Sequence, residues 1–123
     1  MKIPEGYQTV MPYLLINGAD KFIDFTQKVF GAKLILKEMR DEQHIMHAEV
    51  NIGGSLIMFA DSTEEFKHRE ATFMVYVNDA DITFNKAVAE GAEVVRDISD
   101  QQYGRTGGVK DPFGITWWIT SVI

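Results

Sequence analysis

The sequence has no cysteine and no excess of positive charge. The missing cysteines exclude disulfides, thiolate metal sites and cysteine nucleophiles. Lysine and arginine number 12 against 18 acidic residues, for a formal net charge of −6. A nucleic-acid partner is therefore not expected, because such proteins usually carry a basic stripe. The sequence also contains no block of like charge that would indicate a membrane-binding patch.

Long apolar segments are also missing. No run of about 18 apolar residues is present to cross a membrane. The chain becomes polar by Lys2 and Glu5, unlike a signal peptide, so we expect a cytoplasmic protein. What remains is a chain of 123 residues, 46% hydrophobic and 24% charged, which is typical of one globular domain with a real core.

The apolar periodicity predicts the same order of elements twice: strand, helix, strand, strand, strand. In the first half we expect strands at 10–16, 33–39, 45–52 and 55–60 and a helix at 19–30, capped by Asn17 or Asp20. In the second half we expect strands at 72–77, 93–98, 104–111 and 115–122 and a helix at 79–90.

A weak internal repeat accompanies this order. Gly31-Ala32 and the aliphatic pair after it lie 60 positions before Gly91-Ala92 and a second aliphatic pair. An internal duplication explains these matches better than a chance coincidence of apolar residues does. We therefore predict an α+β fold of two tandem βαβββ modules within a single domain, 1–123. Module one spans about 8–60, a polar linker spans 61–71, and module two spans about 72–121.

Strand alternation separates two faces of each predicted sheet. One face, which includes Ile57 and Trp117, is entirely apolar and is expected to lie under a helix. The other face mixes large apolar groups with polar ones, among them Tyr13, Glu49 and Trp118. This mixture is typical of a concave ligand pocket, and it equally suits a dimer interface.

Three segments carry a family resemblance: residues 5–25, residues 45–61 and residues 103–117, the last containing Asp111-Pro112-Phe113-Gly114. They resemble the vicinal oxygen chelate superfamily, which holds glyoxalase I, bleomycin and fosfomycin resistance proteins and extradiol dioxygenases. The PhnB-like branch, also described as 3-demethylubiquinone methyltransferase-like, is most similar. The resemblance extends from about Pro4 to Ile119. It implies the glyoxalase/bleomycin resistance/dihydroxybiphenyl dioxygenase-like fold, a curved half-barrel. The Asp-Pro-Phe-Gly element itself is interpreted as a structural turn, with Asp111 bonding the backbone.

Metal-dependent members of this superfamily hold a divalent ion with His, Glu or Gln on the first and fourth strands of each module. The resemblance carries these positions onto Met11, Met58, Thr72 and Trp118. None of the four is a suitable ligand for such an ion. The resemblance therefore implies a chain without metal or other cofactor, in which Trp118 forms a wall of the cavity.

Several side chains are candidates for contact with a ligand. His47 and Glu49 lie two apart on one strand, as a base or ligand-orienting pair or as a structural pair. Arg105, next to Tyr103, is placed to meet an anion or to pair with an acidic residue. The candidate ligand-binding residues are Met11, Tyr13, His47, Glu49, Met58, Thr72, Met74, Tyr103, Arg105 and Trp118. For the three methionines, ordinary packing is the alternative.

These observations favour a metal-free small-molecule-binding protein of the glyoxalase/bleomycin resistance type that acts as a homodimer. The sequence identifies neither the ligand nor any reaction; His47 and Glu49 are the only candidates for catalysis. The alternatives are a lyase, isomerase or dioxygenase that uses a divalent metal, and a mixed face that serves only to contact a second subunit.

Overall fold

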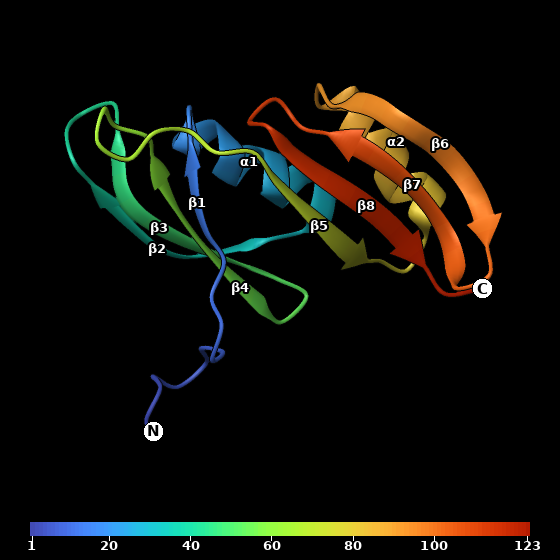
Figure 1. Ribbon diagram of the computed structural model, residues 1–123, viewed down its shortest axis with the longest axis horizontal. Coiled ribbons are helices and arrows are strands. Elements are labelled where there is room, and N and C mark those ends of the chain that lie inside the picture. Colours follow the sequence, from blue (N-terminus) through green and yellow to red (C-terminus); the bar gives the residue numbers. More distant parts are fainter. The chain divides into compact units, whose positions relative to one another are not determined.

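The computed structural model describes residues 1–123 as eight strands and two helices (Figure 1). The chain divides into two compact units. The first unit comprises Met1–Gln27 and Gly31–Arg69, and the second comprises Lys28–Phe30 and Glu70–Ile123. Strand, helix, strand, strand, strand is the order in each half of the chain, which confirms the α+β fold of two βαβββ modules.

The first unit contains a four-stranded sheet in the order β1-β4-β3-β2. The strands are β1 (Tyr13–Ile16), β2 (Lys33–Met39), β3 (Ile45–Ile52) and β4 (Ser55–Asp61), and the helix between β1 and β2 is α1 (Ala19–Phe30). β1 runs parallel to β4, while the other neighbours are antiparallel. Phe22 of α1 packs edge-on against Phe59 of β4 at a ring-centroid distance of 4.9 Å, so the helix covers the apolar face.

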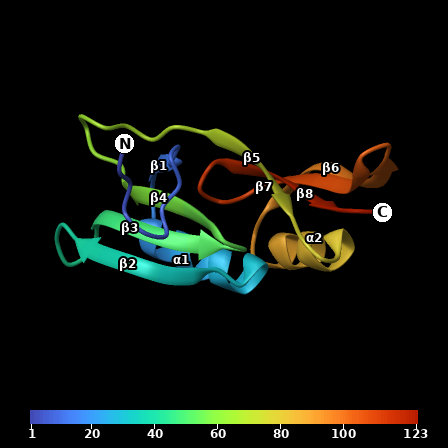
Figure 2. The same ribbon diagram turned by 90° about the horizontal axis from the view of Figure 1, so that it is seen from below.

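The second unit repeats this arrangement in the order β5-β8-β7-β6. Its strands are β5 (Ala71–Tyr76), β6 (Glu93–Gln101), β7 (Gly104–Lys110) and β8 (Ile115–Ser121), and its helix is α2 (Ala80–Ala89). Figures 1 and 2 show α2 on one face of this sheet. Trp117 is buried and contacts the rings of Phe30 and Phe73, as expected of a core residue.

Two boundaries differ from the sequence prediction by three residues, and the others agree to within one residue. β1 begins at Tyr13 instead of Val10, because Pro12 has no N–H to contribute to the ladder, although its carbonyl accepts a bond from the Met58 N–H. β6 continues to Gln101, three residues beyond the predicted end. Neither helix is long and apolar enough to cross a membrane. The cytoplasmic location stays a prediction.

Candidate functional site

A row of side chains crosses the first sheet on the face opposite to the apolar core. Tyr13 of β1 lies beside Met58 of β4, and Met58 lies beside Glu49 of β3. Glu49 and His47 share this face because they are two residues apart on one strand. The structure therefore brings together four of the residues predicted from the sequence to line a ligand site.

These side chains form a continuous hydrogen-bonded chain. The Tyr13 hydroxyl lies 3.2 Å from His47 Nδ1, and His47 Nε2 lies 2.7 Å from Glu49 Oε2. On the other side of the carboxylate, the Tyr7 hydroxyl donates to Glu49 Oε1 at 2.5 Å. Glu49 is only 2% exposed, so both of its oxygens are satisfied by protein groups instead of water.

The hydrogen bonds keep Glu49 ionised despite its burial. Burial alone would raise the pKa of Glu49, but the hydrogen bonds from Tyr7 and His47 outweigh it and lower that pKa below its usual value. The same bond to Glu49, followed by partial desolvation, raises the pKa of the Tyr7 phenol. Glu49 is thus an acceptor for two donors, and this requires His47 Nε2 to carry a proton.

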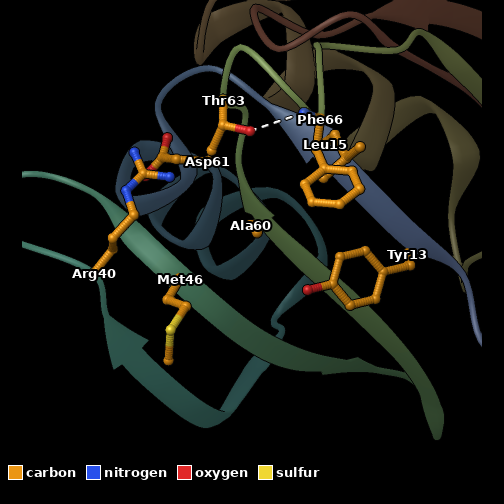
Figure 3. Close-up of a pocket in the computed structure, with 8 residues that line it drawn as sticks. All are labelled: Tyr13, Leu15, Arg40, Met46, Ala60, Asp61, Thr63 and Phe66. Atoms are coloured by element: carbon orange, nitrogen blue, oxygen red, sulfur yellow. Dashed lines mark hydrogen bonds between the residues drawn. The ribbon is translucent and has the colours of Figure 1, made fainter.

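A cavity of about 470 Å³ opens beside this chain in the first unit (Figure 3). Its lining residues are Tyr13, Leu15, Arg40, Met46, Ala60, Asp61, Thr63 and Phe66. The rings of Tyr13 and Phe66 lie on one side, and Met46 and Arg40 lie on the other. The Tyr13 hydroxyl is directed into the space between them, so Tyr13 connects the buried carboxylate to the cavity.

Met46 reaches this cavity because of a β-bulge. Glu38 pairs with His47 and Met39 pairs with Ile45, so Met46 is an extra residue without a partner on β2. The bulge turns Ile45 into the core, where it is fully buried, and leaves Met46 half exposed at the cavity. Strict alternation along the strand therefore does not predict that Met46 lines the cavity, and no signal in the sequence marks the bulge.

Asp61 lines the cavity, yet its carboxylate is already occupied. Oδ1 accepts the backbone N–H groups of Gly18 and Ala19 at the start of α1, and Oδ2 accepts the N–H of Ile45. The prediction that Asn17 or Asp20 caps α1 was wrong, because the helix has no side-chain cap of its own. Asp61, at the end of β4, supplies the missing acceptors.

The mixed face of the second unit is arranged differently. Met74 lies beside Trp118, Trp118 beside Gly108, and Gly108 beside Arg96. A Cβ atom on Gly108 would lie 2.7 Å from Trp118 Cζ3, so the indole lies directly on the β7 backbone. The Arg96 guanidinium lies 6.0 Å from the indole centroid, at the limit of a cation–π contact. Trp118 is therefore held against its own sheet.

The remaining candidates lie apart from the hydrogen-bonded chain. Thr72 is exposed on β5, Tyr103 is exposed in the turn between β6 and β7, and Met11 precedes β1. Arg105 donates Nε and Nη2 to Asp81 of α2 and Nη1 to Asp100 of β6. For Arg105 the structure shows the acidic-pairing alternative.

The turn at Asp111 is structural, as its sequence predicts. Asp111 Oδ1 accepts the N–H groups of Phe113 and Ile115, and Oδ2 accepts the indole N–H of Trp117. Asp111 is buried, so these three bonds replace its hydration. The turn fixes the start of β8 and the core position of Trp117.

Residues 8–119 match the family model of the glyoxalase/bleomycin resistance protein/dioxygenase superfamily. The chain belongs to this superfamily. An uncharacterised protein of Mycobacterium bovis is 30% identical over 118 residues, which cover 86% of this chain and 78% of that protein.

Two solved structures share the fold. The PhnB protein of Bacillus cereus has a TM-score of 0.77 at 20% identity, over 94% of this chain and 100% of that one. TnmS3, an antibiotic binding protein from Streptomyces sp. CB03234, has a TM-score of 0.71 at 15% identity, over 100% of this chain and 99% of that one. At these identities the likeness shows the fold alone.

The side chains present do not fit the divalent ion that some members of the superfamily hold. No three His, Asp or Glu side chains are grouped as ligands. His47 and Glu49 come from one strand and are hydrogen-bonded to each other. Their remaining polar atoms are bonded to Tyr13 and Tyr7, respectively. The positions that correspond to the superfamily's metal ligands hold two thioethers, a hydroxyl and an indole, in Met11, Met58, Thr72 and Trp118. These groups are poor ligands for a hard or borderline cation. These side chains therefore do not form a site for such an ion.

Proposed function

We propose that this protein binds a small organic molecule, without a metal, in the cavity of its first unit. The observation that carries the proposal is the composition of the cavity wall. Leu15, Met46, Ala60 and the rings of Tyr13 and Phe66 supply apolar surface, and a few polar groups are set among them. A volume of about 470 Å³ lies within the range of small-molecule sites. That TnmS3, of the same fold, binds an antibiotic supports the proposal.

Binding can be followed through the ε-methyl groups of the six methionines. Met46 lines the cavity and is 51% exposed, whereas Met74 is 48% exposed on β5 and lines no part of it. The two are matched in solvent access and differ in position. In a screen of aromatic fragments by ¹³C-methyl NMR with a chelator present, we expect the Met46 resonance to move saturably and the Met74 resonance to stay in place.

Two variants locate the binding event. Phe66→Ala removes an aromatic wall from the cavity and should weaken any fragment that shifts Met46. Tyr76→Ala removes an exposed ring of similar size from β5 and should leave the affinity unchanged. If no fragment shifts Met46, or if shifts appear only after a divalent metal is added, the proposed function is wrong. The second result would favour the metal-dependent lyase, isomerase or dioxygenase.

We also propose that the protein acts as a homodimer. Exposed aliphatic side chains support this assembly: Leu34, Ile35 and Leu36 on β2, and Val94 and Val95 on β6. Consecutive exposed aliphatics on a strand are costly in water and are typical of surfaces that a second chain covers. These residues are also separate from the cavity lining, so the dimer and the binding site are tested independently.

A further inference from the structure

The polar groups around the cavity have donors to offer and few free acceptors. Both oxygens of Asp61 already accept backbone N–H groups. Thr63 Oγ1 accepts the Phe66 N–H at 2.8 Å, which leaves its hydroxyl proton for another partner (Figure 3). Arg40 has only donors, and its ion pair with Asp41 is long, 3.9 Å from Nε to Oδ2. A ligand that satisfies this wall must itself present acceptors.

Tyr13 is the group whose role changes with protonation. Because Glu49 is an ionised acceptor, His47 Nε2 carries a proton, and in the neutral imidazole Nδ1 accepts the Tyr13 hydroxyl proton. When His47 takes up a second proton, Nδ1 becomes a donor to the Tyr13 oxygen. The Tyr13 O–H bond stays intact, and its proton is then free to donate to a group in the cavity, into which the hydroxyl is directed. Protonation of His47 thus converts Tyr13 into a donor for a ligand.

The charges that face His47 come from every neighbouring strand. Glu49 lies on the same strand, Glu38 of β2 is its direct cross-strand partner, and Tyr13 approaches from β1. Asp61 of β4 and Arg40, just beyond β2, lie at the cavity. The carboxylates of Glu49 and Asp61 accept hydrogen bonds from protein donors, and Glu38 is exposed to solvent. Arg40 is therefore the positive group that remains at the cavity wall.

We propose that the cavity takes a compact aromatic carboxylate, with its ring system between Tyr13 and Phe66 and its carboxylate bound by Arg40 and by Tyr13. Binding is coupled to proton uptake on His47. This inference rests on the proposed function and specifies the ligand class of the same site. It runs against the net charge of −6, which by itself attracts cations. The preference for charge therefore distinguishes the local geometry from the field of the whole chain.

Isothermal titration calorimetry with three probes of one size tests the proposal: 1-naphthoate, 1-naphthalenemethanol and 1-naphthylmethylamine. We expect naphthoate to bind at least about tenfold more tightly than either other probe, since charge-assisted hydrogen bonds supply the difference. Naphthoate stays ionised from about pH 5 to pH 8, the interval in which imidazole titrates. The affinity for naphthoate should fall about tenfold as the pH rises from about 5 to about 8. Binding enthalpies measured in buffers of different ionisation enthalpy should show that a proton is taken up on binding.

Variants separate the two contributions. Tyr13→Phe keeps the ring and removes the hydroxyl, so it should weaken naphthoate and abolish the dependence on pH. Arg40→Gln should remove the preference for the anion, and Arg40→Lys should restore part of it. Arg69→Gln is the matched control, because Arg69 is an exposed arginine of the same unit outside the cavity lining. Thermal unfolding confirms that each variant is folded.

The possible outcomes are distinct. Tighter binding of the alcohol or the amine, or an affinity for naphthoate that is unchanged by pH and by Tyr13→Phe, overturns the ligand class while the proposed function stands. If none of the three probes binds and none shifts Met46, the cavity does not take compact aromatic molecules, and both proposals fail. An equal loss of affinity in Arg40→Gln and Arg69→Gln assigns the anion preference to general electrostatics and overturns the role of Arg40.

Discussion

Glu49 shows how a single residue organises this site. A carboxylate in the middle of a sheet is costly unless its oxygens are bonded, and here Tyr7 and His47 provide both partners. These bonds keep the carboxylate charged and fix the tautomer of His47. They also orient the imidazole toward the Tyr13 hydroxyl. Tyr13, which we propose contacts a ligand, is therefore positioned by a residue that is 2% exposed.

Removing this carboxylate should destabilise the first unit. We expect Glu49→Ala to lower the free energy of unfolding by about 2 kcal/mol or more, because Tyr7 and His47 lose their buried acceptor. Urea unfolding measures the change. The control is Glu38→Ala, an exposed glutamate on the neighbouring strand, which should stay within about 0.5 kcal/mol of the wild type. Equal effects of the two substitutions would show that the hydrogen-bonded chain contributes nothing.

The stabilisation by Glu49 should also depend on pH. Its pKa is lowered in the folded protein, so the folded state favours the charged form, and the contribution is present above the ordinary value of 4.5. It is lost as the pH falls through the lowered pKa. The difference in unfolding free energy between the wild type and Glu49→Gln should therefore be constant above about pH 5 and shrink in acid. A difference that grows in acid would mean that the pKa of Glu49 is raised.

Alternation along the strands predicted Tyr13, His47 and Glu49 correctly as neighbours on one face. It could not find Tyr7, which precedes the first strand and has no periodicity to mark it. Phe66 was missed for a related reason, since the polar stretch around it was interpreted as a linker. Yet Phe66 lines the cavity. Such contacts depend on how loops fold back onto the sheet, and strand patterns carry no information about that.

At the scale of elements, Asp61 joins three parts of the first unit. It ends β4, and its carboxylate binds the first turn of α1 and the first N–H of β3. α2, by contrast, begins with its own cap, Asp79, whose side chain accepts the Ile82 N–H. The two helices thus begin by different means, one with a local acceptor and one with an acceptor 42 positions away.

Comparison of the two aspartates tests this difference. We expect Asp61→Ala to cost more than about 2 kcal/mol of unfolding free energy, because three backbone donors lose a charged acceptor. Asp79→Ala removes one exposed capping bond and should cost about 1 kcal/mol. Chemical denaturation followed by circular dichroism measures both. A larger loss for Asp79→Ala would contradict the role assigned to Asp61.

β7 and β8 depend on a glycine for their packing. We expect Gly108→Ala to destabilise the protein by about 1–3 kcal/mol, because the new methyl group would overlap the Trp118 ring, 2.7 Å away. In a double-mutant cycle, Trp118→Ala should relieve most of this cost. Additive effects of the two substitutions would show that the indole does not lie on Gly108 in solution.

Both helices and every strand were predicted from apolar spacing and from glycine and proline positions. The errors lie at boundaries. Pro12 delays the start of β1, and the bulge at Met46 changes the face of the sheet to which Ile45 and Met46 point. Each error arises from a backbone detail that the hydrophobic pattern does not encode.

At the scale of the whole molecule, the repeated order of elements and the superfamily were both predictable, because repeated elements and motifs extend along most of the chain. The cavity of the first unit was not predictable in the same way. The sequence distributed its candidates over both modules, whereas the described cavity is lined by residues of the first unit alone. The two modules share an architecture and differ in what their mixed faces hold.

The homodimer is tested at this scale. Native mass spectrometry and light scattering should report a mass twice that of the 13.9 kDa chain. Ile35→Glu places a charge among the exposed aliphatic residues of β2 and should produce a folded monomer if β2 lies in the interface. Lys33→Gln, which changes the net charge by the same single unit on the same strand, is the control for net charge. A wild-type mass of one chain at micromolar concentration would refute the assembly.

We propose that the first unit holds an organic ligand in a cavity without a metal. The most direct test is a crystal structure of the protein soaked with aromatic fragments, with anomalous data collected for transition metals. We expect fragment density between Tyr13, Met46 and Phe66 and no anomalous peak at His47 or Glu49. A cation coordinated by those two side chains, or a cavity that stays closed to every fragment, would contradict it.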